Sequence, residues 1–463
     1  MSAKSTSRTR SMPRFHLLSL GCPKNTVDAN GMAFLLQRAG YRPVDHADQA
    51  DVIIVNTCGF IADARRESLE TMQSLAANLR EDQRLIAAGC WAQRDPERLM
   101  AWVPELDGVL GTRSWVALPE LLAQIKARRQ RVARQRLVFT EARAMALPES
   151  VGAPGYAISG RSAFLKIADG CSRRCAFCAI PLIKGDMVSR PIEAIVKDAQ
   201  RLRDKRALEF NLIAQDSTTY GRDLGYTDGL AELLERLVAV LPESSWLRIL
   251  YMFPGQITPR LIEVMADHPQ VLPYVDLPLQ HAHPDVLRRM NRPSDMQELR
   301  RTLVELRARL PHVCLRTTLI AGFPGETEAE FQTLLDFVQE QRFDRLGVFT
   351  YSHEEGTLAA RYEDDVPEEI KEARFDALMT LQQGISLERN REQVGRVLPV
   401  LLEGTDENLT VGRSYRDAPE IDGLVLIERR VAKVDRMVTV KITRALEYDL
   451  VGELVGETGE VTP

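Results

Sequence analysis

Three cysteines lie close together in the segment IADGCSRRCAFCAI, residues 167–180. Cys171, Cys175 and Cys178 follow a short apolar run, so we expect them at the C-terminal end of a strand, where βα folds carry their functional groups. A structural zinc site usually has four ligands, and no fourth cysteine or histidine follows nearby. Three thiolates at this spacing can instead hold three irons of a [4Fe–4S] cluster and leave the fourth iron open to a small molecule.

A second set of cysteines is more widely spaced. Cys22, Cys58 and Cys90 end the runs LLSLGC, VIIVNTC and LIAAGC, at separations of 36 and 32 residues. Each separation is about one βα crossover, so neighbouring parallel strands would bring the three thiols to the same edge of a sheet. The pattern predicts a second metal cluster, and independently buried cysteines are the alternative. Cys314 lies inside a strand-like run, and we expect it to be a packing residue.

Polar residues and glycines follow several other predicted strands, where a barrel would gather them around a ligand. They are Gln215, Asp216, Gln280, His281, Arg316, Gly322 and Gly325. Their shared position at C-terminal strand ends favours a binding role. A single histidine is often a hydrogen-bonded structural residue, and that role is the alternative for His281.

Two α/β regions must position these groups. Residues 14–125 alternate short apolar runs with segments of helical spacing, which predicts a parallel sheet covered by helices. Between residues 160 and 385, six strand-like runs separated by helical segments predict an open, partial (β/α)6 barrel. Thr327 and Glu330 form a capping-box pattern after the turn GFPGE, so a helix should start there.

The last region is different, because residues 390–457 hold short β runs separated by turn residues. This pattern predicts a small antiparallel β-barrel. The expected fold class is α/β, with the following parts: an N-terminal sheet domain at 14–128, a linker at 129–155, a partial barrel at 156–388 and the small barrel at 389–457.

The overall composition fits a protein of two or three globular domains, with 463 residues, 44% apolar residues and a net charge of −5. No apolar run approaches the roughly 20 residues that span a bilayer. Seven cysteines in a large chain argue against a secreted disulfide framework, so we expect a cytoplasmic protein. We interpret the basic stretch at 1–14 as a solvated tail, with a transit peptide as the alternative. We interpret the arginine run at 126–136 as a solvated helix face, with a nucleic-acid patch as the alternative.

The CxxxCxxC loop, with Phe177 before its last cysteine, resembles the signature of the radical S-adenosylmethionine superfamily. The resemblance implies that the methionine amine and carboxylate of S-adenosylmethionine bind the open iron and that cleavage yields a 5′-deoxyadenosyl radical. It also implies that Phe177 and some of the strand-end residues contact this cosubstrate: Gln215, Asp216, Gln280, Arg316, Gly322 and Gly325.

Nearly the whole chain resembles the methylthiotransferases, in which a cysteine-bearing α/β domain, a CxxxCxxC barrel and a small barrel follow in this order. The resemblance implies two [4Fe–4S] clusters, one on each cysteine set, and a TRAM domain that recognises the substrate. The stretches SLGCPKN, NTCGFIADAR, AQDSTTYGRDL, DLPLQHA and GVFTYSHEEGT look like the branch that modifies an aspartate of ribosomal protein number twelve, the RimO type.

The charge of the small barrel favours a protein substrate. Residues 391–457 contain 10 Lys and Arg and 13 Asp and Glu, whereas a module that grips phosphates should be basic. We therefore expect methylthiolation of that aspartate's β-carbon, with an external electron donor, a sulfur donor and no membrane. Methylthiolation of an adenosine in transfer RNA is the alternative within enzymes, and an iron–sulfur RNA-binding scaffold is the alternative outside them.

Overall fold

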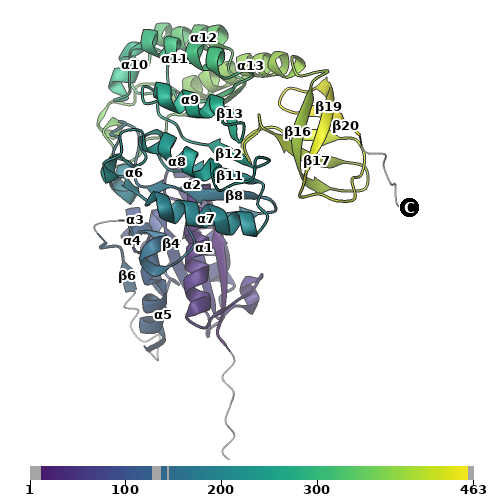
Figure 1. The fold of residues 1–463 in the computed structure, drawn as a ribbon. Coiled ribbons are helices and arrows are strands. Elements are labelled where there is room, and N and C mark those ends of the chain that lie inside the picture. Colours follow the sequence, from purple (N-terminus) through teal and green to yellow (C-terminus); the bar gives the residue numbers. More distant parts are fainter. Residues whose placement is uncertain (1–11, 128–136, 143–144, 457–463) are drawn as a thin grey trace, which may run out of the picture. The chain divides into compact units, whose positions relative to one another are not determined.

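The computed structural model describes residues 12–127, 137–142 and 145–456 (Figure 1). The interpretations of the N-terminal tail and of most of the arginine run fall outside these residues. The described chain forms two compact units, one made of residues up to 155 together with 182–185, and the other of 156–181 together with the residues from 186 onward. The limits of the four parts inside the chain stay a prediction. No described helix is both long and apolar enough to cross a membrane.

The first unit contains the predicted parallel sheet, with the order β2-β1-β3-β4-β5-β6. Its strands are β1 (Arg14–Ser19), β2 (Arg42–Pro43), β3 (Val52–Thr57), β4 (Arg84–Gly89), β5 (Gly108–Gly111) and β6 (Leu137–Phe139). Its helices are α1 (Pro23–Arg38), η1 (Ala47–Gln49), α2 (Ala62–Ala77), α3 (Cys90–Arg94), α4 (Pro96–Trp102), η2 (Thr112–Ala117), α5 (Leu118–Ala127) and η3 (Pro148–Val151). All six residues of β3 are buried, as expected for a central strand covered on both faces.

The second unit contains the predicted open barrel, a seven-stranded sheet with the order β15-β14-β13-β12-β11-β8-β7. The six expected strands are parallel neighbours, and β7 pairs antiparallel with β8 at one edge. The strands are β7 (Tyr156–Ser159), β8 (Ser162–Lys166), β11 (Glu209–Ile213), β12 (Trp246–Ile249), β13 (Val271–Asp276), β14 (Cys314–Ala321) and β15 (Arg345–Thr350), with a separate pair β9 (Ala168–Asp169) and β10 (Val188–Ser189).

Helices of this unit follow the strands and build one large apolar core with them. They are α7 (Ile192–Asp204), η4 (Ser217–Thr219), η5 (Arg222–Leu224), α8 (Gly229–Val238), α9 (Pro259–Asp267), α10 (Pro284–Arg289), α11 (Met296–Arg309), α12 (Glu328–Gln341), η6 (Ala359–Arg361) and α13 (Glu368–Arg391). The short helix α6 (Ile180–Lys184) is divided between the units, because its residues from 182 onward belong to the first unit. The predicted capping box of Thr327 and Glu330 is confirmed at the start of α12. Two further helix starts carry side-chain caps, Thr258 before α9 and Asp295 before α11.

The C-terminal strands close into a five-stranded barrel, drawn in yellow-green to yellow in Figure 1. They are β16 (Val397–Thr405), β17 (Thr410–Ser414), β18 (Val425–Ile427), β19 (Met437–Ala445) and β20 (Leu450–Leu454). Four neighbouring pairs are antiparallel as expected, but β18 and β20 are parallel. An odd number of strands cannot close a cycle with every pair antiparallel, so one parallel pair is required.

Charged side chains fill the N-terminal end of the open barrel. Glu209, the first residue of β11, is fully buried and bonded to Arg248 Nε at 3.0 Å and to Arg413 Nη2 of the small barrel at 2.6 Å. Burial alone would raise the pKa of Glu209. The two arginines outweigh this effect and lower the pKa to about 2. Arg345, the first residue of β15, forms a matching pair with Asp417 at 2.6 Å. The segment of residues 413–422, called the floor segment below, therefore closes this end of the barrel.

Candidate functional site

The first cysteine set lies at the carboxyl edge of three adjacent strands. Cys22 precedes α1 after β1, Cys58 follows β3 directly, and Cys90 begins α3 directly after β4. These strands are neighbours in the order β1-β3-β4. Gly21 has a φ of +88°, and a Cβ on it would lie 2.8 Å from Cys58 Cβ, so the backbone beside Cys22 passes close to Cys58. The expectation that the three cysteines share one sheet edge therefore agrees with the structure.

Two asparagines connect the loops that carry these cysteines. Asn25, which is 1% exposed, donates through Nδ2 to Leu20 O at 3.0 Å and to Thr57 O at 3.2 Å. Its Oδ1 accepts a hydrogen bond from the Cys90 thiol at 3.4 Å. Asn56 Nδ2 donates to Asn25 O at 2.8 Å. Sequence reasoning missed these asparagines, although Asn25 lies three residues after Cys22 in the quoted stretch SLGCPKN.

The thiols of this set influence one another electrostatically. Burial raises the pKa of Cys58, and the neighbouring charge of Cys22 adds to the rise. Burial also raises the pKa of Cys90, where Cys22 and Cys58 add to the effect and the charge of Lys184 opposes it. Lys184 belongs to the short segment that packs with the first unit, and its Nζ lies 3.2 Å from Asp28 Oδ2. A bound cation would relieve this mutual repulsion by taking the thiolates as ligands.

The loop of the second cysteine set is held on both sides. Ala176 N donates to Met290 O at 2.8 Å, and Ala176 O accepts from Ala359 N at 2.7 Å. Phe177 packs against an apolar cluster that contains Ala176, Ile320, Phe323 and Tyr351. These contacts hold the loop on both sides, and Phe177 contributes to them by packing.

The second set shows the same electrostatic coupling. Burial raises the pKa of Cys171 to about 11, and the charges of Asp216 and Cys175 add to the rise. Burial raises the pKa of Cys178 to about 12, where Cys175 and Cys171 add to the effect and Arg292 opposes it. These thiols would be protonated at neutral pH without a metal, and metal binding would release their protons.

The donor sets suit a cluster of several metal atoms better than one zinc ion. A tetrahedral zinc with bonds of about 2.3 Å needs its sulfurs about 3.8 Å apart. Within the described residues, neither set of three sulfurs gathers within 4.8 Å. Sulfurs spaced more widely than one shared ion allows would suit separate metal atoms of a larger cluster.

An arginine that sequence reasoning missed lies beside the second set. Arg292 Nη1 lies 3.7 Å from Cys175 Sγ, and the side chain is almost fully buried. The guanidinium carbon Cζ of Arg292 lies 4.2 Å from the ring centroid of Phe253, and Cζ of Arg173 lies 4.1 Å from the same centroid. Both arginines therefore make cation–π contacts with this ring. Arg173 also pairs with Asp216 at 2.9 Å. Arg292 therefore presents positive charge to the cysteine loop, whereas the charge of Arg173, within the loop, is balanced by Asp216.

Gln215 and Asp216 lie after β11 as predicted, near the end of β8. Gln215 Nε2 donates to Asp169 Oδ1 at 3.1 Å, and its Oε1 is buried without a hydrogen-bond partner in the described structure. Asp216 is 1% exposed, with Oδ2 paired to Arg173 and Oδ1 accepting from Thr218 N at 3.1 Å. Gln215 thus keeps one acceptor available, whereas both oxygens of Asp216 already have donors.

Gln280, Gly322 and Gly325 lie at or beyond the ends of neighbouring strands. Gln280 has a φ of +75° and extends the sheet beside β14 through backbone hydrogen bonds to Thr318 and Ile320. Gly322 and Gly325 have positive φ in the turn before α12, as a glycine-rich turn requires. Their N–H groups donate at 2.7 Å, to Glu326 Oε2 and Asp365 Oδ1 respectively. The turn also supplies Phe323 to the apolar cluster of the cysteine loop.

Arg316 does not lie at a C-terminal strand end, and its predicted position is wrong. It is the third residue of the eight-residue strand β14, which continues for five more residues. Its guanidinium bonds Asp276 at 3.0 Å and Asp422 of the floor segment at 3.4 Å. The strand-like run VCLRTTLIAG continues well past Arg316, so this residue belongs to the first half of the strand and not to its C-terminal end.

His281 has a structural environment. The ring is fully buried, and its Nδ1 accepts from His283 N at 2.9 Å. Burial lowers the pKa of His281 to about 3, so the ring is neutral at physiological pH. These contacts favour the structural alternative stated above. Cys314 is also buried within the fold, and its thiol donates to Arg416 O at 3.4 Å.

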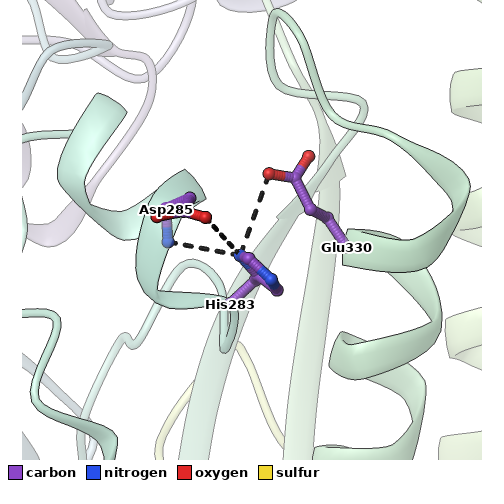
Figure 2. Close-up of side chains that lie close together, drawn as sticks. All are labelled: His283, Asp285 and Glu330. Atoms are coloured by element: carbon purple, nitrogen blue, oxygen red, sulfur yellow. Dashed lines mark hydrogen bonds and ion pairs between the residues drawn. The ribbon is translucent and has the colours of Figure 1, made fainter.

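One more group of metal-ligand side chains gathers in the described residues, formed by His283, Asp285 and Glu330 (Figure 2). His283 Nδ1 lies 3.8 Å from Glu330 Oε1 and 4.0 Å from Asp285 Oδ2. The same nitrogen accepts from Asp285 N as the cap of α10, and both Glu330 oxygens bond Arg289 at 3.0 Å. The lone pairs that a cation would need already have donors, so the group is explained by two helix caps and an ion pair.

Comparisons with known proteins agree with this architecture. The family model of the Radical SAM superfamily matches residues 165–338, and that of the TRAM domain matches residues 394–455. A third model, described as Uncharacterized protein family UPF0004, matches residues 14–111. A solved structure, the radical S-adenosylmethionine methyltransferase TsrM from Kitasatospora setae, has a TM-score of 0.54 at 15% identity over 73% of this chain and 72% of that one, which supports the fold.

The cysteine loop at the open barrel and the matching superfamily model define a radical S-adenosylmethionine enzyme. Curated relatives specify it further. The chain is 49% identical to the ribosomal protein uS12 methylthiotransferase RimO of Roseiflexus sp. strain RS-1, over 96% of this chain and 97% of that one. It is 45% identical to the protein of that name from Chloroflexus aurantiacus, over 95% and 99%. The chain belongs to the RimO family of methylthiotransferases.

Proposed function

We propose that the protein methylthiolates the β-carbon of an aspartate in ribosomal protein uS12, with S-adenosylmethionine as the source of both the radical and the methyl group. The observation that carries this proposal is the near-full-length identity to curated uS12 methylthiotransferases, which covers both cysteine sets and the small barrel.

Two cysteine sets imply two clusters with different tasks. Cys171, Cys175 and Cys178 would hold the cluster that binds S-adenosylmethionine, and Cys22, Cys58 and Cys90 would hold a second cluster. When bound, the cluster on Cys171, Cys175 and Cys178 would supply the electron for sulfonium cleavage. The cluster on Cys22, Cys58 and Cys90 would hold the sulfur for insertion. The target needs such chemistry, because a β-methylene hydrogen is too weakly acidic for a side-chain base at neutral pH.

The protein residues position the reactants and exclude water. Phe177 fixes the cysteine loop by packing, and Gln215 offers the buried acceptor Oε1 to a cosubstrate donor. We propose that Gln280, Gly322 and Gly325 line the same cosubstrate site, with Asp216 orienting Arg173. Arg316 is left out of this site, because Asp276 and Asp422 already bond its guanidinium.

The small barrel supports a protein substrate. Arg413 is buried against Glu209 and therefore not available to phosphates, and the remaining surface keeps an excess of acidic residues. An acidic module suits a basic ribosomal protein. An external electron donor and a sulfur donor are also required, and a ribosomal substrate implies a cytoplasmic location.

The test uses anaerobically reconstituted protein with a reductant, S-adenosylmethionine and uS12. We expect 5′-deoxyadenosine and a methylthio mass increase on one aspartate of uS12. Modified adenosine in transfer RNA without a change in uS12 would contradict the substrate, and metal binding without 5′-deoxyadenosine would favour a scaffold.

Iron analysis tests the two-cluster proposal separately. About eight irons per chain are expected, and Cys22→Ala should lower the count to about four. Cys314→Ala is the matched control, because this buried cysteine belongs to neither set, and its count should stay at about eight. A count of about four in the unaltered protein would leave the first cysteine set without a role.

A further inference from the structure

A pocket of about 330 Å³ lies in the second unit, where the ends of α11 and α13 meet the start of the small barrel. Its volume is within the range of small-molecule sites. Four arginines line it: Arg307, Arg389, Arg396 and Arg416. This concentration of one charge is a local exception on a chain whose net charge is −5.

Two of the four arginines are paired with carboxylates. Arg389 bonds Asp344 at 3.2 Å and Glu392 at 2.8 Å. Arg416 bonds the same oxygen of Asp344 at 2.9 Å. These two acidic residues neutralise two guanidinium charges.

The other two arginines are bonded to neutral groups. Arg307 donates to the side-chain oxygen of Gln341 at 3.2 Å, and Arg396 donates to that of Gln393 at 2.5 Å. Burial lowers the pKa of Arg307; the charge of Asp344 opposes this effect and that of Arg389 adds to it. Within the described residues, the ion pairs at this pocket leave positive charge in excess.

Arg416 adds one unpaired donor to the residues that line the pocket. Its side chain is 2% exposed, and its Nε is buried without a hydrogen-bond partner in the described structure. Buried donors are almost always paired, and an unpaired one is costly. An anion in the pocket that Arg416 lines would supply the missing acceptor.

We propose that this pocket binds a phosphate group through Arg307 and Arg396, beside the paired Arg389 and Arg416. Guanidinium forks match the oxygens of a phosphate, and a dianion would balance the excess charge. The phosphate could belong to the backbone of ribosomal RNA next to the protein substrate or to a free anion, and both present the same chemistry. No cysteine lines the pocket, and only the RNA source of the phosphate rests on the proposed function.

Isothermal titration of the full-length reconstituted protein tests this proposal with two probes, inorganic phosphate and a short single-stranded RNA. Saturable binding of at least one probe is expected, and Arg307→Gln with Arg396→Gln should weaken it at least about tenfold. Arg309→Gln is the matched control, because this exposed arginine lies on the same helix outside the pocket. Arg396→Gln alone serves if the double variant folds poorly, since Arg396 is only half-buried.

The two probes separate the sources of the phosphate. Tighter binding of RNA, with an affinity that falls steeply with salt, would assign the pocket to the RNA backbone. Binding of inorganic phosphate alone would assign it to a free anion. The proposal is wrong if neither probe binds saturably, or if the arginine variants bind as tightly as the unaltered protein.

Discussion

Arg292 should control the reduction potential of the cluster on the second cysteine set. Its Nη1 lies 3.7 Å from Cys175 Sγ, and the side chain is almost fully buried. A positive charge at this distance stabilises the reduced state, which carries one more electron. Arg292→Gln keeps a polar side chain but removes the charge, so it should make the cluster harder to reduce.

The size of this effect follows from the distance. Two unit charges 3.7 Å apart interact by about 4 kcal/mol at an effective dielectric constant of about 20. The added electron is spread over the cluster, so the smaller range for a hydrogen bond to a charged group, about 1.5–3 kcal/mol, is the better guide. For a one-electron couple this corresponds to a fall of about 65–130 mV in the midpoint potential.

The assay is a redox titration followed by electron paramagnetic resonance. It uses a background in which Cys22, Cys58 and Cys90 are replaced by alanine, so that one cluster gives the signal. Arg174→Gln is the matched control. Arg174 lies in the cysteine loop, but its side chain is exposed and paired with Asp186. An unchanged or more positive potential in Arg292→Gln would refute the reasoning, as would an equal shift in the control.

Three further predictions concern the ion pairs and the first cysteine set. Glu209→Gln and Arg413→Gln should each lower the free energy of unfolding by about 3–5 kcal/mol in urea titrations, and the double variant should lose less than the sum of the two. Because the pKa of Glu209 is lowered from 4.5 to about 2, its contribution of about 3 kcal/mol is present above pH 4.5 and is lost as the pH falls to 2. Thermal unfolding should show a smaller loss over this pH range in Glu209→Gln than in the unaltered protein, because other carboxyls such as Glu330 still contribute. Gly21→Ala should reduce the iron content by the share of one cluster, because its methyl group would meet Cys58, whereas Gly40→Ala has a similar φ and open space and should keep the full content.

The sequence predicted those features that depend on local pattern. The strands before Cys22, Cys58 and Cys90 are short apolar runs that recur after about one βα crossover. Because these strands pair in parallel, their C-terminal ends lie at the same edge of the sheet. The contact of Arg292 with Cys175 joins residues 117 positions apart, and no local pattern specifies it. The extent of this strand was predicted correctly as VCLRTTLIAG, but Arg316 lies near its start, and its pairing with Asp276 and Asp422 is long-range and not visible in the local sequence.

The floor segment has a consequence for protein engineering. Its arginines and acids meet opposite charges that are fully buried at the base of the larger barrel, as Arg413 does with Glu209 and Asp417 with Arg345. In a chimera that carries the small barrel of a distant homologue, the charged residues of the larger barrel would be buried without counterions. Each such residue would lower the free energy of unfolding by several kcal/mol. A change of recognition module therefore requires the reciprocal residues of both partners to be transplanted together.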